Sequence, residues 1–181
     1  MLSYITDIDK AILLSLYNFI SSHHYTFLDN VMIFLTHIGH RGLIWFVFAF
    51  VLFLNKQTRA AGIITVIALL IGMLAGDIIL KNIVQRPRPY VDFPDYLILI
   101  EKLNSYSFPS GHTTLSFAAA CAIGLHLKKC AVLCCILACL IAFSRAYLFM
   151  HYPTDIIGGI ILGILCAKAA GYIYKKVTVL A

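Results

Sequence analysis

Charged side chains are scarce in this sequence. Asp, Glu, Lys and Arg together make up 12% of its 181 residues, whereas 61% of the residues are hydrophobic and the mean hydropathy is +0.91. An ordinary soluble domain contains about 25% charged and about 45–50% apolar residues. The composition therefore excludes a soluble globular domain and predicts an integral membrane protein, in which lipid surrounds most of the apolar surface.

Signals of several other kinds of protein are also absent. There is no internal repeat, low-complexity tract or basic leader, so we expect one domain over residues 1–181 and no cleaved signal peptide. The six cysteines lack the spacing of a zinc site or of a secreted disulfide framework, so we expect them to be reduced, small apolar residues. They lie in apolar stretches of the second half of the chain: Cys121, Cys130, Cys134, Cys135, Cys139 and Cys166.

Five apolar stretches are candidates for membrane-spanning helices, which need about 20 mostly apolar residues. Ala60–Leu80 meets this length with Asp77 as its only charge, whereas the first stretch is long enough only if His40 and Arg41 lie at the membrane interface. Whether the first span is one helix or is broken near His37–Arg41 stays open. Each stretch is bounded by charges or by Pro and Gly, as the ends of spans should be. The five stretches are Ile38–Leu54, Ala60–Leu80, Ser110–Leu127, Cys130–Phe149 and Pro153–Tyr174.

Two earlier segments, Ala11–Ile20 and Phe27–Leu35, are too short to cross a membrane but carry apolar residues on one helical stripe. We expect them to be amphipathic helices that lie in the membrane interface. The predicted fold is therefore all-α, with interfacial helices over residues 1–37 and a transmembrane catalytic bundle of about five helices over residues 38–181.

The distribution of charge predicts the orientation in the membrane. With five spans, one side of the membrane receives six Lys and Arg residues and no acid, and the other side receives seven Lys and Arg residues together with all eight acids. Three of these seven, Lys81, Arg88 and Arg145, are assigned to function below, which leaves the excess of cations on the first side. The positive-inside rule makes the first side cytoplasmic, so we expect a plasma-membrane protein with a cytoplasmic C-terminus. The six basic residues are Lys56, Arg59, Lys128, Lys129, Lys175 and Lys176.

Three short segments concentrate the unusual residues, and in this topology all three open onto the extracytoplasmic face. Their cations, Lys81, Arg88 and Arg145, suit a phosphate, because Arg gives bidentate contacts to its oxygens and Lys supplies a compact charge. Ser110 and Gly111 precede an apolar helix, where unpaired backbone N–H groups at the positive end of the dipole attract an anion. The pattern predicts a phosphate site at one membrane surface.

Two histidines in these segments can divide the work of phosphoryl transfer, in which one group attacks phosphorus and another protonates the departing oxygen. His151 is the better nucleophile, because Asp155 follows four residues later and can fix the ring tautomer that frees the other nitrogen. His112 is then the general acid. This chemistry needs no metal, and the sequence offers no carboxylate cluster for a pair of divalent ions, so we expect no metal and no cofactor.

These segments resemble the three signature motifs of the type 2 phosphatidic acid phosphatase (PAP2) superfamily. The motifs K-x6-R-P, P-S-G-H and S-R-x5-H-x3-D match Lys81–Pro89, Pro109–His112 and Ser144–Asp155 at every specified position and in order. The resemblance implies metal-independent hydrolysis of a lipid phosphate through a phosphohistidine on His151, with His112 as acid and Asp155 as its orienting partner. It also implies a set of phosphate ligands: Lys81, Arg88, Ser110, Gly111 and Arg145.

The resemblance leaves the lipid open. Short bacterial members of the superfamily act on undecaprenyl diphosphate, phosphatidylglycerophosphate, phosphatidic acid or lipid A phosphates, and the first two are favoured here. The partners expected are the lipid substrate and the bilayer, without nucleic acid, because the aromatic residues fit interfacial belts better than stacking platforms. The oligomeric state stays open.

The same residues allow other interpretations. Arg86 and Arg88 could be interfacial anchors, Lys81 and Asp77 an ordinary ion pair one helical turn apart, and His37 and His40 packing residues rather than metal ligands. A multi-pass anion or lipid transporter also gathers cations at a membrane surface. A vanadate-dependent peroxidase resembles the superfamily at the same oxyanion site, although the predicted spans argue against it.

Overall fold

The described chain is a bundle of α-helices without any strand. The computed structural model describes residues 2–22 and 26–180, and the side chains of residues 6–22 and 26–179. The predicted all-α class is confirmed for these residues. The elements are α1 Leu2–Ser21, α2 Thr26–Ile38, η1 His40–Gly42, α3 Leu43–Leu54, α4 Arg59–Gly72, η2 Met73–Leu80, α5 Lys81–Val84, α6 Pro89–Asp92, α7 Gly111–Gly124, α8 Lys128–Tyr147 and α9 Pro153–Leu180.

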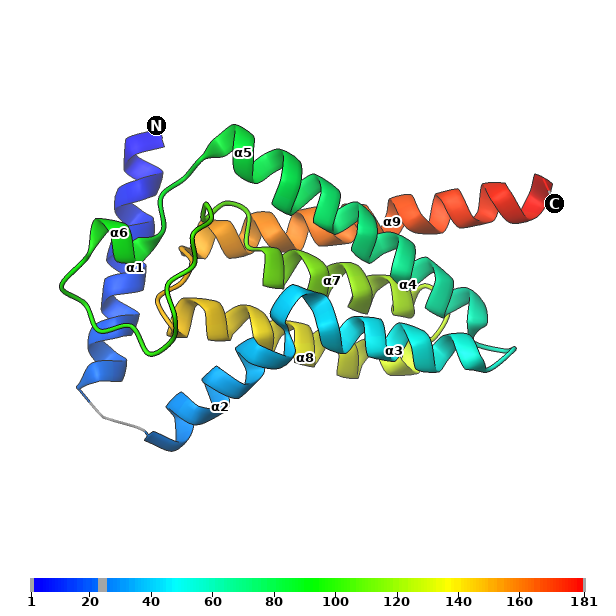
Figure 1. The fold of residues 1–181 in the computed structure, drawn as a ribbon, viewed down its shortest axis with the longest axis horizontal. Helices are drawn as coiled ribbons and strands as arrows, with labels where there is room; N and C mark the ends of the chain where they lie inside the picture. Colours follow the sequence, from blue (N-terminus) through cyan, green and yellow to red (C-terminus); the bar gives the residue numbers. More distant parts are fainter. Residues whose placement is uncertain (1, 23–25, 181) are drawn as a thin grey trace.

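Helix α7 forms the centre of the bundle and packs against α4, α8 and α9 (Figure 1). Small residues make this possible, since ten of its fourteen residues are buried and most of those are Gly, Ala, Ser or Thr. A Cβ atom at Gly163 of α9 would lie 2.6 Å from the backbone oxygen of Thr114, so the two helices touch through their backbones. Trp45 of α3 closes the other side, where its indole N–H donates to Ser116 Oγ at 2.9 Å.

Three helical segments are long and apolar enough to cross a membrane: Arg59–Asp92, Lys128–Tyr147 and Pro153–Val179. A fourth span is possible if Thr26–Ile38 and His40–Leu54 act as one broken helix, bent by 46°. Five spans were predicted, and the difference lies in α3 and α7, which have 12 and 14 residues. The break falls at Gly39 and η1, so that α2, predicted as an interfacial helix, is one arm of the bent pair.

The second predicted span is a continuous helix from Arg59 to Val84 that includes a π-helical stretch, η2, in its middle. Gln85 then adopts a left-handed backbone conformation with φ 49° and ends the helix. Lys81 therefore lies in the last turn before the chain leaves the bundle. The predicted pair with Asp77 is confirmed, at 2.5 Å between Lys81 Nζ and Asp77 Oδ1.

Helix α1 lies across one end of the bundle (Figure 1) and is twice as long as the ten residues predicted for it. Leu13 is buried beneath it against Phe149 and Tyr152, whereas the outward side chains of Ile12 and Phe19 are more than half exposed. The sequence pattern missed the first turns of α1 because they contain Asp7 and Asp9, which interrupt the apolar stripe.

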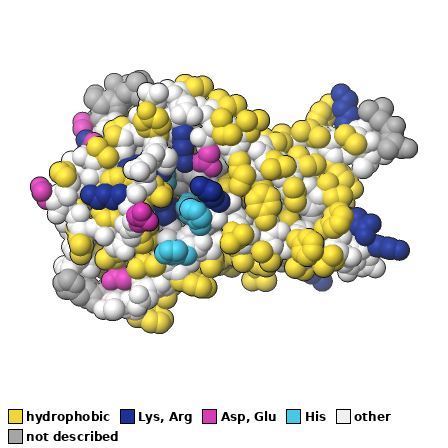
Figure 2. Space-filling model, in the orientation of Figure 1, with side chains coloured by type: hydrophobic (Ala, Val, Ile, Leu, Met, Phe, Trp, Pro, Cys, Tyr) yellow, Lys and Arg dark blue, Asp and Glu magenta, His cyan; other side chains and the backbone are white. Residues whose placement is uncertain are grey.

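The chain ends lie at opposite ends of the molecule (Figure 1), and the charges divide in the same way. In the view of Figure 2, the acidic side chains lie toward the end covered by α1, and the charged side chains seen at the opposite end are all basic. Hydrophobic side chains cover the region between the two ends. The separation of charge expected from the sequence is therefore present in three dimensions.

Candidate active site

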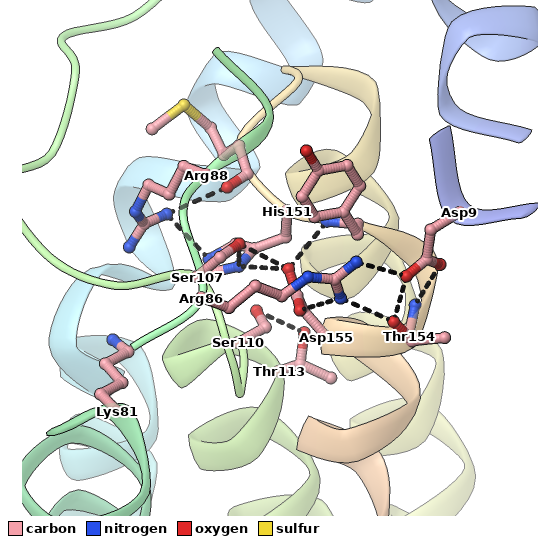
Figure 3. A network of polar contacts seen from close by, with 12 residues as sticks. Asp9, Lys81, Arg86, Arg88, Ser107, Ser110, Thr113, His151, Thr154 and Asp155 are labelled. Carbon is pink, nitrogen blue, oxygen red and sulfur yellow. Dashed lines mark hydrogen bonds and ion pairs between the residues drawn. The ribbon is translucent and has the colours of Figure 1, made fainter. Parts of the chain in front are cut away.

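The three motif segments meet at the end of the bundle that α1 covers (Figure 3). The first leaves α5 and runs into α6, the second opens α7, and the third joins α8 to α9. A backbone hydrogen bond of 3.1 Å from Ser110 N–H to the Asp155 carbonyl fastens the second segment to the third. The structure thus brings together all eight residues that the sequence analysis placed at the site.

The second segment provides the predicted helix N-terminus. Helix α7 begins at Gly111 with Ser110 in an extended conformation before it, and the buried Ser110 hydroxyl oxygen accepts a 2.9 Å hydrogen bond from Thr113. A Cβ at Gly111 would lie 2.6 Å from Asp77 Oδ1. Only glycine therefore lets the start of α7 approach the Asp77–Lys81 pair so closely.

His151 lies between two sets of polar groups, one at each ring nitrogen. Its Nδ1 is 3.6 Å from Asp155 Oδ2 and 3.4 Å from Ser107 Oγ, and the Ser107 hydroxyl also donates to Asp155 Oδ2 at 2.5 Å. On the other side, Arg88 Nη1 donates to His151 Nε2 at 3.1 Å, which makes Nε2 the unprotonated nitrogen. The tautomer is the one expected of a nucleophile, with its proton on the side of Asp155.

The surroundings keep His151 neutral. Burial lowers its pKa well below the usual range, and the positive charges of Arg88, Arg145 and Lys81 lower it further. A neutral imidazole retains the lone pair that a nucleophile needs.

A cavity of about 410 Å³ connects the two histidines, since His112 and His151 both line it together with Lys81 and Gly111. The imidazole of His112 comes from the first turn of α7. Its Nε2 lies 3.1 Å from the Thr36 carbonyl of α2, and because a carbonyl only accepts, Nε2 carries a proton in this arrangement. The structure therefore places the predicted acid and the predicted nucleophile on one cavity.

The two arginines of the motifs differ in how many of their donors are already bonded to other protein groups. Arg88 is held in place by the Ser105 carbonyl and hydroxyl and by the Met150 carbonyl, at 2.6, 2.9 and 3.0 Å. Arg145 is 2% exposed and donates from Nη1 to the Thr36 hydroxyl. Its Nε and Nη2 have no partner among the described residues. A buried guanidinium with free donors is set up to receive an anion.

A network next to the site was missed in the sequence. Arg86 lies between two carboxylates, 2.7 Å from Asp9 of α1 and 2.8 Å from Asp155, and its guanidinium stacks 4.1 Å from the centre of the Tyr152 ring (Figure 3). Thr154 completes the network, since its N–H and hydroxyl both donate to Asp9. The interpretation of Arg86 as an interfacial anchor is therefore wrong, because its guanidinium pairs with two carboxylates of the protein.

Two further histidines, His37 and His40, lie near the site. His37 Nδ1 is 2.6 Å from the Ile33 carbonyl, and the His40 ring lies 5.9 Å from the His112 ring. Over the side chains that the structure describes, no three His, Cys, Asp or Glu residues are grouped to hold a metal ion. The interpretation of His37 as a structural residue fits its contact with the Ile33 carbonyl of its own helix.

Residues 61–178 match the PAP2 superfamily, a stretch that contains all three motifs. The chain belongs to this superfamily. Its membership agrees with the fold, since the crystal structure of a transmembrane PAP2-type phosphatidylglycerolphosphate phosphatase from Bacillus subtilis superposes with a TM-score of 0.75. That likeness has 26% sequence identity and covers 96% of this chain and 87% of the solved one.

Two curated PAP2 relatives carry the name undecaprenyl-diphosphatase. The protein from Sulfolobus acidocaldarius is 32% identical over 149 residues, which cover 82% of this chain and 71% of the relative. BcrC from Bacillus subtilis is 30% identical over 148 residues, covering 80% of this chain and 74% of the relative. The similarity to both extends over most of the bundle and beyond the motif region.

Proposed function

We propose that this PAP2 protein hydrolyses a membrane lipid phosphate through a phosphohistidine formed on His151, without a metal. As a member of the superfamily it is a lipid phosphate phosphatase. The mechanism is supported above all by the two sides of His151: Nδ1 faces Asp155 and Ser107, and the unprotonated Nε2 belongs to a ring that lines the same cavity as His112.

The reaction has two steps. His151 Nε2 attacks phosphorus, the P–O bond to the leaving group breaks, and its electron pair goes to the oxygen that His112 protonates. Water, deprotonated by His112, then attacks the phosphohistidine, releases inorganic phosphate and regenerates the imidazole. Asp155 holds the His151 tautomer in both steps and stabilises the ring while it is positively charged.

The transferred phosphoryl group gains charge on its oxygens, and the free donors of the site are arranged to receive it. Arg145 offers Nε and Nη2, which have no other partner among the described residues, and the first turn of α7 offers the Gly111 N–H. Lys81 and Arg88 add positive charge from the first motif, and the Ser110 hydroxyl adds a further donor. These five residues are the proposed phosphate ligands.

We also propose that five segments cross the membrane: η1–α3, α4–α5, α7, α8 and α9. Helix α7 is about 21 Å long at about 1.5 Å per residue, shorter than the apolar thickness of a bilayer. It is surrounded by other helices, so protein rather than lipid covers its ends. The basic end of the molecule then faces the cytoplasm and the active site faces the extracytoplasmic side, with α1 along the interface.

The substrate class favoured is a lipid diphosphate or phosphomonoester such as undecaprenyl diphosphate, phosphatidylglycerophosphate or phosphatidic acid. Support comes from the named relatives and from a second hollow of about 580 Å³ that shares Lys81 and Ser105 with the catalytic cavity. Tyr90, Asn104 and Tyr106 line this hollow. It provides room for a head group beside the phosphate.

The test is trapping of labelled phosphate on the purified protein. His151→Ala should abolish both the trapped label and phosphate release, whereas His126→Ala, an exposed histidine at the opposite end of the bundle, should retain both. An active His151→Ala protein would contradict the mechanism. Transport of a lipid phosphate without hydrolysis would instead favour a transporter, and vanadate-dependent halide oxidation would favour a peroxidase.

A further inference from the structure

The wall of the catalytic cavity contains a short turn that the phosphatase motifs do not include. It is η1, His40–Gly42, which joins α2 to α3, and both His40 and Arg41 line the cavity that contains His112 and His151. The turn comes from a part of the chain far from the motifs. Its two side chains nevertheless border the space where the substrate reacts.

The turn is fixed in place by close packing. A Cβ at Gly39 would lie 2.8 Å from Ile141 Cγ2 and 3.3 Å from the ring of His112, and one at Gly42 would lie 3.2 Å from Leu115. Arg41 itself has φ 48° and ψ 23°, a left-handed conformation that side chains other than Asn, Asp and Gly adopt rarely. Packing on both sides of Arg41 therefore holds it in an unfavourable conformation, which is common in functional turns.

Arg41 has no ion pair with any side chain that the structure describes, although it is exposed to the cavity. The acid that lines the same cavity, Asp77, is already bound to Lys81 at 2.5 Å. An arginine held beside the reacting groups without a carboxylate partner is available for an anion.

The roles proposed for the two histidines indicate which part of the substrate lies beside this turn. His151 attacks phosphorus from one side, so the leaving group departs on the side of His112. The ring of His40 is 5.9 Å from that of His112, and Arg41 follows it in the chain. His40 and Arg41 therefore border the leaving group rather than the transferred phosphate.

From a lipid monophosphate the leaving group is an alcohol, and from a lipid diphosphate it is a second phosphate. Only the second carries charge that Arg41 can bind. Met73, Ile78 and Leu115 give the same cavity an apolar wall, which suits the first carbons of a lipid chain. The cavity thus contains a place for each part of a lipid diphosphate.

We propose that His40 and Arg41 form a second phosphate subsite, which binds the lipid-linked phosphate of a diphosphate substrate and makes the enzyme selective for diphosphates over monophosphates. This inference rests on the proposed phosphatase function. During attack, the bond from phosphorus to the bridging oxygen breaks and its electron pair remains on the lipid phosphate. Arg41 stabilises that negative charge, and His112 protonates the departing phosphate oxygen.

The test compares the diphosphate and the monophosphate of one isoprenoid alcohol, presented in the same detergent micelles. Arg41→Asn removes the charge and keeps a side chain that tolerates the left-handed backbone, and Arg41→Lys keeps the charge. Arg59→Gln changes an exposed arginine at the start of α4, at the far end of the bundle. Arg41→Asn should lower kcat/KM for the diphosphate at least tenfold more than for the monophosphate. Arg41→Lys should lose part of the selectivity, and Arg59→Gln none.

A binding measurement separates selectivity from folding. Inorganic pyrophosphate should inhibit the wild-type protein more strongly than inorganic phosphate, and Arg41→Asn should remove that difference. Equal losses on the two lipids, or an unchanged preference for pyrophosphate, would overturn the second subsite while leaving the phosphatase function intact. A wild-type protein that releases phosphate from neither lipid would overturn the proposed function itself and this inference with it.

Discussion

Asp9 of the first helix and Arg86 of the first motif segment form a direct ion pair, with 2.7 Å between Asp9 Oδ2 and Arg86 Nη2. The two residues are 77 positions apart, and the Asp9 side chain is 1% exposed. The other end of the same guanidinium contacts Asp155 Oδ1 at 2.8 Å. One arginine therefore connects helix α1 to the carboxylate that we propose orients His151.

This connection makes α1 part of the active site. With Asp9→Asn, Arg86 loses one of its two carboxylates and Asp155 is held less firmly, so kcat should fall by roughly tenfold. Stability should fall by about 3 kcal/mol, the usual cost of removing one partner from a buried pair. Thermal unfolding in detergent and phosphate release measure the two effects. Asp7→Asn, which changes an exposed acid on the same helix, should leave both unchanged.

Ser107 positions the catalytic carboxylate from the other side. Its hydroxyl donates to Asp155 Oδ2 at 2.5 Å and lies 3.4 Å from His151 Nδ1. Ser107→Ala removes a hydrogen bond to a charged group, worth about 1.5–3 kcal/mol, and leaves the phosphate ligands intact. We expect kcat to fall by about tenfold or more with little change in KM. A change confined to KM would show that Ser107 contacts the substrate instead.

The site residues at the specified positions of the three motifs were predicted from the sequence, and the other site residues were missed. Lys81, His112, His151 and Asp155 were predicted because their chemistry and spacing repeat a recognisable pattern. Asp9 was missed because its partner Thr154 is 145 positions away, and no local pattern encodes such a contact. Thr36 was missed for the same reason, although it contacts both His112 and Arg145.

The fold was also predictable only in part from the sequence. Hydropathy predicted the long helices, because burial in lipid requires a continuous apolar run. It left open whether the chain is broken near His37–Arg41, where the bend at Gly39 lies, and it did not predict the full length of α1, because each depends on tertiary contacts. Gly39 is pressed against Ile141 and His112, and Asp9 is compatible with a buried helix face only because Arg86 lies opposite.

Arg145 is expected to oppose folding while it supports catalysis. Its Nε and Nη2 are buried without partners among the described residues, so the guanidinium bears a desolvation cost that only a bound anion offsets. Arg145→Met should therefore raise the stability of the ligand-free protein by roughly 1–2 kcal/mol while lowering kcat/KM at least 100-fold. Unfolding without ligand measures the first effect. Destabilisation of Arg145→Met would show that its bond to Thr36 outweighs the buried charge.

The pKa of His151 should determine the acid limb of the pH–rate profile, which is the pH below which phosphohistidine formation slows. In the proposed mechanism the neutral ring attacks phosphorus, and burial together with Arg88, Arg145 and Lys81 lowers its pKa well below its usual value. Because a lowered pKa keeps the ring neutral as the pH falls, the rate of phosphohistidine formation at saturating substrate should persist below about pH 6.5, the usual histidine pKa, and decline only in more acidic buffer. Arg88→Gln removes one of the positive charges, so it should raise this pKa and move the decline to higher pH. Rapid-quench measurement of the trapped phosphate across pH tests both statements, and an acid limb that moves to lower pH in Arg88→Gln would contradict the electrostatic explanation.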